Sequence, residues 1–123
     1  MHLEQSLLRE MIGGVPDDAV QRQVDAYNAH DLGTFVACYA EAVVIEDADG
    51  GVLASGREQM RERYRSLFES LPNVHAEIPV RIRVGSYVVD EERVSGGPDG
   101  DLHAVAIYRI DGDGLIDRVR FLR

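Results

Sequence analysis

The sequence contains no lysine, and it contains 13 arginines. A mechanism in which a lysine amine forms a Schiff base with a carbonyl substrate is therefore excluded. Acids outnumber these bases, because 22 aspartates and glutamates give the chain a formal net charge of −9. Nucleic acids and anionic membranes bind basic surfaces, so we expect neither as a partner.

Cysteine and long apolar runs are scarce as well. Cys38 is the only cysteine, so the chain forms no internal disulfide and needs no oxidising compartment. It falls in a helical pattern beside Phe35, which favours a packed thiol over a nucleophile. No apolar run approaches the length of a membrane span, and the N-terminus lacks the apolar core of a signal peptide. We therefore expect a cytoplasmic protein.

Metal binding has no support in the sequence. Four scattered histidines and one cysteine do not form a set with metal-ligand spacing. The glycine-rich acidic loops at 96–101 and 111–114 lack the ligand pattern of a calcium loop and are predicted to be turns. Neither a metal nor any other cofactor is expected.

Helices are predicted in the first part of the chain. Residues 1–14 have the spacing of a short amphipathic helix, and residues 15–123 form a single domain. That domain starts with a helix whose apolar stripe includes Gln23 and Tyr27. A second helix, capped by Asp31, follows directly and extends to Tyr39. The two helices make an αα-hairpin.

The stretch from Val43 to Tyr64 predicts a strand, a tight turn, a short return strand and a third helix. The strand ends in Glu46 and Asp47, and Ser55 with Glu58 has the spacing of a capping box. An acid at the inner end of an apolar strand is partly desolvated, which raises its pKa toward that of a general base. The alternative is a turn acid that accepts backbone N–H groups. The arginines of the third helix are predicted on its solvated face: Arg57, Arg61, Arg63 and Arg65.

Four strands are predicted after the helices, because the period changes from 3.6 to 2 residues. They span 74–84, 87–95, 101–111 and 114–122. The fold class is therefore α+β, with three helices packed on a curved antiparallel sheet. Such a cone encloses a pocket, and alternation predicts its lining from Val20, Gln23, Tyr27, Tyr39, Ile45, Asp47, Tyr64, Ala106, Tyr108, Val119 and Phe121.

Two further strand features bear on function. The acidic run 90–92 places at least one acid on each strand face. It is interpreted as a solvated cluster that pairs with Arg81, Arg83 or Arg93, or as a run with one member facing the cavity. The outward row at His103, Val105, Ile107 and Arg109 is too apolar for open solvent, so we expect a homodimer through the outer sheet face, with Arg118 and Arg120 near its rim.

The sequence resembles the nuclear transport factor 2-like superfamily over about residues 17–122. Four motifs carry the resemblance: Asn28-Ala29-His30-Asp31-Leu32, the strand that ends in Glu46-Asp47, the helix start Gly56-Arg57-Glu58, and the final turn at Asp111–Gly114. The steroid delta-isomerase-like and polyketide-cyclase-like branches are the most similar. The resemblance implies a cone-shaped cystatin-like roll, a fold that accommodates enzymes and binding modules alike.

The resemblance also implies roles for individual residues. Asp47 falls on the aspartate that moves a proton between two carbons of an enone in ketosteroid isomerases. Tyr39 and Tyr64 fall on two tyrosines that support that family's oxyanion hole. Its direct donors, a tyrosine and a protonated aspartic acid, are replaced by Gln23 and Ala106.

The predicted function is accordingly isomerase-like. A small apolar carbonyl compound would bind in the cone, with proton transfer by Asp47 and no cofactor. The alternative is a non-catalytic small-molecule-binding or accessory domain of the same fold. In either case the predicted ligand-binding residues are Gln23, Tyr27, Tyr39, Tyr64, Ala106, Tyr108 and Phe121.

Overall fold

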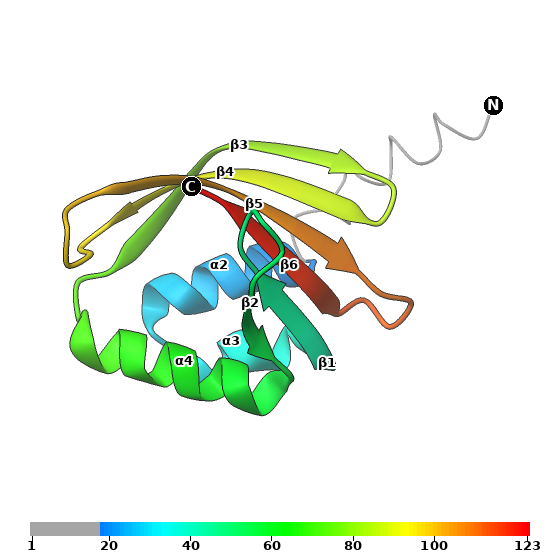
Figure 1. Ribbon diagram of the computed structural model, residues 1–123, viewed down its shortest axis with the longest axis horizontal. Coiled ribbons are helices and arrows are strands. Elements are labelled where there is room, and N and C mark those ends of the chain that lie inside the picture. The colour runs from blue at the N-terminus through cyan, green and yellow to red at the C-terminus, as the bar shows by residue number, and fades with distance from the viewer. Residues whose placement is uncertain (1–17) are drawn as a thin grey trace.

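The computed structural model describes residues 18–123, and the helix predicted within 1–14 lies outside them. Three helices lie on one side of a curved six-stranded sheet (Figure 1). The predicted α+β class, with helices packed on a curved and mostly antiparallel sheet, is confirmed. In the described range no helix is both long and apolar enough to cross a bilayer.

The first two described helices form the predicted hairpin. They are α2 (Ala19–Ala29) and α3 (Leu32–Ala37), and each begins after an aspartate whose carboxylate accepts a backbone N–H of the first turn. These caps are Asp18 and Asp31. Between the helices His30 adopts a left-handed conformation with φ of 56°, which ends α2 and reverses the chain.

Helix α4 (Arg57–Ser70) starts differently from the prediction. The expected capping box between Ser55 and Glu58 does not form, because the N-cap position belongs to Gly56. Gly56 has a φ of 89°, a conformation that favours glycine, and it turns the chain sharply out of the preceding strand. Ser55 thus remains in that strand, where its N–H donates to the side chain of Gln59 at 2.9 Å.

The sheet has the order β2-β1-β6-β5-β4-β3, and only β1 and β6 run parallel within it. Tyr39, expected in the second helix, is instead the first residue of β1, because α3 ends at Ala37. The four C-terminal strands lie within two residues of their predicted bounds. The strands are β1 (Tyr39–Glu46), β2 (Val52–Ser55), β3 (His75–Val84), β4 (Tyr87–Ser95), β5 (Leu102–Ile110) and β6 (Ile116–Leu122).

The hydrophobic core lies where the helices meet β1, β5 and β6. Phe35, Ile45, Met60 and Ile116 are among its fully buried side chains. Burial of side chains of this size stabilises the fold by about 1.5–3 kcal/mol each. The core does not fill all of the space beneath β3, β4 and the end of α4, and that end of the molecule contains the site described next.

Candidate functional site

A cavity of about 370 Å³ lies between the helices and the concave face of the sheet. Its floor is formed by buried side chains that include Gln23, Tyr39 and Tyr108. Its mouth is lined by the exposed side chains of Arg63 and Arg123 and by the loop 97–101 between β4 and β5. The cavity therefore connects a buried polar floor to solvent.

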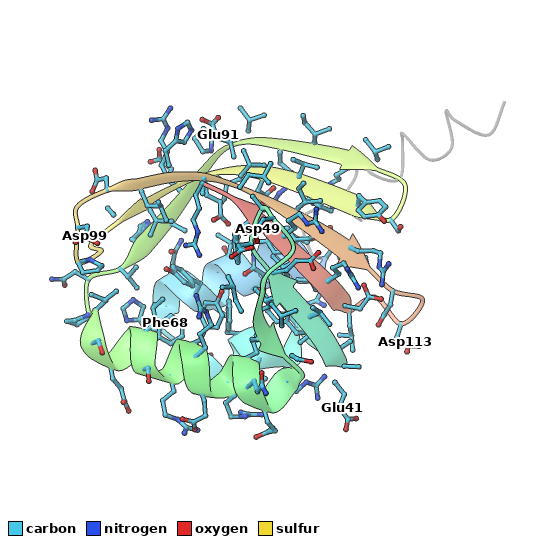
Figure 2. The ribbon with its side chains drawn as sticks, viewed as in Figure 1. Glu41, Asp49, Phe68, Glu91, Asp99 and Asp113 are labelled. Carbon is cyan, nitrogen blue, oxygen red and sulfur yellow. The ribbon has the colours of Figure 1, made fainter. Side chains whose placement is uncertain are left out.

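The mouth is held in place by a close backbone contact. In Figure 2, Asp99 lies at the turn between β4 and β5, above the end of α4. At the base of this loop a Cβ on Gly96 would lie 2.3 Å from the carbonyl oxygen of Asn73, in the segment that leaves α4. Gly96, with a φ of 80°, is thus required for the loop to approach this segment.

Four side chains from four elements form a chain of hydrogen bonds in the cavity floor. The Tyr39 hydroxyl donates to Oε1 of Gln23 at 2.9 Å, and Nε2 of Gln23 donates to the Tyr108 hydroxyl at 3.1 Å. The Tyr108 hydroxyl then donates to Oε2 of Glu92, also at 3.1 Å. Because each donor points the same way, the chain ends on the Glu92 carboxylate, the natural acceptor for it.

Glu92 has an unusual carboxyl group. Burial in the cavity raises its pKa from 4.5 to about 7, and the nearby Asp90 carboxylate adds to the rise. The hydrogen bond from Tyr108 and the charge of Arg123 act in the opposite direction. Glu92 reaches this position because it lies directly across from a small residue, Ala104, on β5. A carboxyl group that titrates near neutral pH can both accept and return a proton.

The cavity phenols stay protonated at neutral pH. Burial raises the pKa of Tyr64 to about 12, and it raises those of Tyr27, Tyr39 and Tyr108 as well. The negative charge of Glu92 contributes to all four shifts, which indicates that the phenols surround it. Within residues 18–123 no hydrogen bond engages the hydroxyls of Tyr27 and Tyr64, so both are available to a ligand.

The other two acids of the run 90–92 have structural partners. Asp90 is completely buried and accepts two hydrogen bonds from the guanidinium of Arg81, at 2.7 and 2.9 Å. Glu91 points away from the helices (Figure 2) and lies 2.7 Å from His103. The predicted pairing with Arg81 is therefore present for Asp90, whereas Glu92 is the member that faces the cavity.

Asp47 lies outside the cavity, contrary to the prediction. Strand β1 ends at Glu46, so Asp47 already belongs to the turn. Its Oδ1 accepts the N–H of Gly51 at 2.9 Å, and its own N–H donates to the Gly51 carbonyl, also at 2.9 Å. It is absent from the residues that line the cavity. The structure thus gives Asp47 the alternative role, that of a turn acid.

Most of the predicted ligand-binding residues do meet in the cavity. Ala106 is the exception, because it is fully buried opposite Asp90 and does not reach the lining. Sequence reasoning gave Arg123 no role, placed Arg63 on the solvated face of its helix, and left open whether an acid of the run 90–92 faces the cavity. Glu92 lies on the same sheet face as Tyr108, and the register between β4 and β5 is what shows this. The predicted residues that line the cavity are Gln23, Tyr27, Tyr39, Tyr64, Tyr108 and Phe121.

This arrangement agrees with comparisons to known proteins. Residues 20–119 match the SnoaL-like domain. The chain belongs to this family. The match covers the helices, the cavity floor and nearly all of the sheet of this SnoaL-like protein. No curated protein matches the chain.

Solved structures show the same architecture. A cystatin-fold protein from Novosphingobium aromaticivorans is 32% identical, with a TM-score of 0.79 over 85% of this chain and 95% of that one. A polyketide cyclase-like protein from Sinorhizobium meliloti is 21% identical, with a TM-score of 0.73 over 84% and 92% of the two chains.

A protein with a ketosteroid isomerase-like fold from Catenulispora acidiphila, solved with trimethylamine, is also 21% identical. Its TM-score is 0.70 over 85% of this chain and 84% of that one. At such identities these last two likenesses establish the fold alone. The predicted membership of the nuclear transport factor 2-like superfamily is confirmed, with its isomerase-like and cyclase-like neighbours.

Proposed function

We propose that this SnoaL-like protein binds a small apolar carbonyl compound in the cavity and transfers a proton at the carbon next to the carbonyl, with Glu92 as the acid–base group. The observation that carries the proposal is the Glu92 carboxyl, which accepts a hydrogen bond from Tyr108 in a cavity lined by four phenols and has a pKa of about 7. That value is close to the optimum for general acid–base catalysis at neutral pH.

The remaining groups supply the other requirements of the reaction. In the first step Glu92 takes the proton from carbon, the electron pair of that C–H bond forms a carbon–carbon double bond, and the π electrons of the carbonyl move onto its oxygen to give an enolate. The free hydroxyls of Tyr27 and Tyr64 are the donors available to that oxygen, and donors aimed at developing charge lower the barrier substantially. Glu92 then returns the proton to another carbon, so the reaction is an isomerisation and consumes no cofactor.

These donors replace those that the resemblance implied. Gln23 and Ala106 occupy the positions of the family's direct donors, and Gln23 is already engaged by Tyr39 and Tyr108. The proton acceptor moves in the same way, from the expected Asp47 at the end of β1 to Glu92 in β4. The proposed site thus takes its acid–base group from β4 and its donors from α2 and α4 of the same cone.

The proposal is tested by deuterium exchange at the carbon next to the carbonyl of β-tetralone, followed by proton NMR in deuterated buffer. We expect the wild type to accelerate exchange and Glu92→Gln to lose about a hundredfold or more of that acceleration. Glu91→Gln is the matched control, because Glu91 is the adjacent acid on the opposite face of β4. Equal rates for wild type and Glu92→Gln, with β-tetralone bound, would support the non-catalytic binding domain instead.

Cytoplasmic location stays a prediction from the sequence.

A further inference from the structure

Most arginine side chains within residues 18–123 form hydrogen bonds or ion pairs with other residues. Arg63 and Arg123 differ, because neither forms a hydrogen bond or an ion pair within residues 18–123. The guanidinium carbon of Arg123 instead lies 5.5 Å from the centre of the Phe121 ring. Arginines with a carboxylate or carbonyl partner are Arg57, Arg61, Arg65, Arg81, Arg83, Arg93, Arg109, Arg118 and Arg120.

Both of these arginines line the mouth of the cavity. They come from distant parts of the chain, Arg63 from α4 and Arg123 from the segment after β6, yet both lower the pKa of Tyr64. Arg123 also lowers the pKa of Glu92. The two positive charges therefore act on the same phenol of the cavity lining.

Acids at the mouth do not neutralise these arginines by direct contact. Asp99 and Asp101 also line the opening, on the loop between β4 and β5, but neither forms an ion pair with Arg63 or Arg123. Within residues 18–123 no carboxylate forms an ion pair with either arginine, so two positive charges beside one cavity are available to an anionic ligand. The cavity lining also includes apolar side chains, among them Leu67 and Phe121.

We propose that the ligand is an apolar carboxylic acid whose carboxylate binds to Arg63 and Arg123 while its apolar body extends to the phenols and Glu92. The inference rests on the proposed function in one respect, that the cavity holds a small molecule. Guanidinium groups bind carboxylates through charge-assisted and often bidentate hydrogen bonds. Binding of the carboxylate at the mouth would also orient the ligand, so that its apolar body points into the cavity.

The test compares the affinities of β-naphthoate and β-naphthamide, which share a ring system and nearly the same shape but differ in charge. Titration calorimetry of the wild type should show about tenfold tighter binding of the acid. Arg63→Gln and Arg123→Gln should each weaken binding of the acid about threefold or more, without changing that of the amide. Arg65→Gln is the matched control, an arginine of the same helix that pairs with Glu62 and does not line the cavity.

Each possible result has a defined meaning. Equal affinity for acid and amide in the wild type would overturn the carboxylate inference but leave the cavity as a binding site for neutral ligands. An acid preference that survives the double variant Arg63→Gln/Arg123→Gln would overturn the assignment to these arginines. Binding of neither probe would overturn the inference together with ligand binding in the cavity. Loss of proton transfer in Glu92→Gln with the acid preference intact would confirm the two proposals separately.

Discussion

The hydroxyl of Tyr108 and the carboxylate of Glu92 are 3.1 Å apart and joined by a hydrogen bond that Tyr108 donates. This contact connects the Glu92 carboxyl to a buried network that reaches Tyr39. It also opposes the effect of burial, because a hydrogen bond to the charged form lowers the pKa of Glu92. The reactivity of Glu92 is therefore adjusted by a residue that need not touch the substrate.

Removal of the Tyr108 hydroxyl should move the pH dependence of the reaction. In the wild type, kcat/KM for proton exchange should rise with pH to a plateau, with a midpoint near 7 as Glu92 loses its proton. In Tyr108→Phe we expect the midpoint to shift to higher pH, because the ionised carboxylate loses its donor. Exchange rates measured by proton NMR across a series of buffers give both midpoints. An unchanged or lower midpoint in Tyr108→Phe would contradict the claim that Tyr108 lowers the pKa of Glu92.

The partly buried carboxyl of Glu92 should also make stability depend on pH. Between its ordinary pKa of 4.5 and the folded value of about 7, the folded state holds a proton that the unfolded state has released. Stability from this group is therefore fully present below the unfolded pKa and is lost as the pH rises through the folded pKa. The side chain in Glu92→Gln stays neutral at every pH. The free energy of unfolding of this variant should therefore exceed that of the wild type by about 1–3 kcal/mol above neutral pH and equal it at about pH 4.

Urea unfolding of wild type and Glu92→Gln at an acidic and a mildly alkaline pH measures this difference. A constant offset between the two proteins at all pH values would show that Glu92 titrates at its ordinary value. Comparison of the two proteins at each pH cancels the contribution of the other titrating groups.

Sequence patterns were sufficient to predict the architecture, because burial of one face of a helix or strand imposes a regular spacing on the apolar residues. The alternation that placed Ala106 and Tyr108 on one face of a strand is the alternation that the sheet requires, and both are buried there. Alternation does not specify where a strand ends, however. The register between β1 and β2 shifts at Ile45 and Glu46, and the strand stops before Asp47.

The site was harder to predict than the fold for a related reason. In a run of three acids, alternation puts neighbouring side chains on opposite faces of the strand. It does not show which of the two faces is covered by the cavity phenols. Only the pairing of Glu92 with Ala104 on β5 explains why this acid has room to point inward. Arg63 likewise reads as one more exposed residue of α4, because its neighbour Arg123 is 60 residues later in the chain.

Asp47 should be dispensable for chemistry. Replacement by asparagine retains an oxygen that can accept the Gly51 N–H and removes only the charge, so we expect a stability cost of about 1 kcal/mol or less. Proton exchange from β-tetralone should stay within about twofold of the wild type. A loss in Asp47→Asn comparable to that of Glu92→Gln, at unchanged melting temperature, would return the role of base to Asp47.

The outer face of the sheet should form a homodimer. This face carries exposed apolar side chains. It also carries charged side chains that pair with each other within the chain, such as Glu46 with Arg118 and Arg120. We propose a second copy of this chain as the partner, because a face with balanced charge in an acidic protein avoids the repulsion between copies. The exposed apolar residues include Val80, Ile82, Val84, Tyr87 and Leu122.

Sedimentation velocity tests the dimer. Ile82→Arg should shift the wild-type dimer to monomer at micromolar concentration, because it places an unpaired charge in the interface. Ser66→Arg, on the exposed side of α4, is the control and should remain dimeric. A wild type that sediments only as a monomer would contradict the proposal.

The central claim is that the cavity gives Glu92 a carboxyl group that exchanges its proton near neutral pH. Carbon-13 NMR of the side-chain carboxyl, assigned by its absence in Glu92→Gln, follows that titration directly. We predict a midpoint near 7 in the free protein. A midpoint near the ordinary 4.5 would contradict the account, because Glu92 would then be a solvated surface acid with no special capacity for proton transfer.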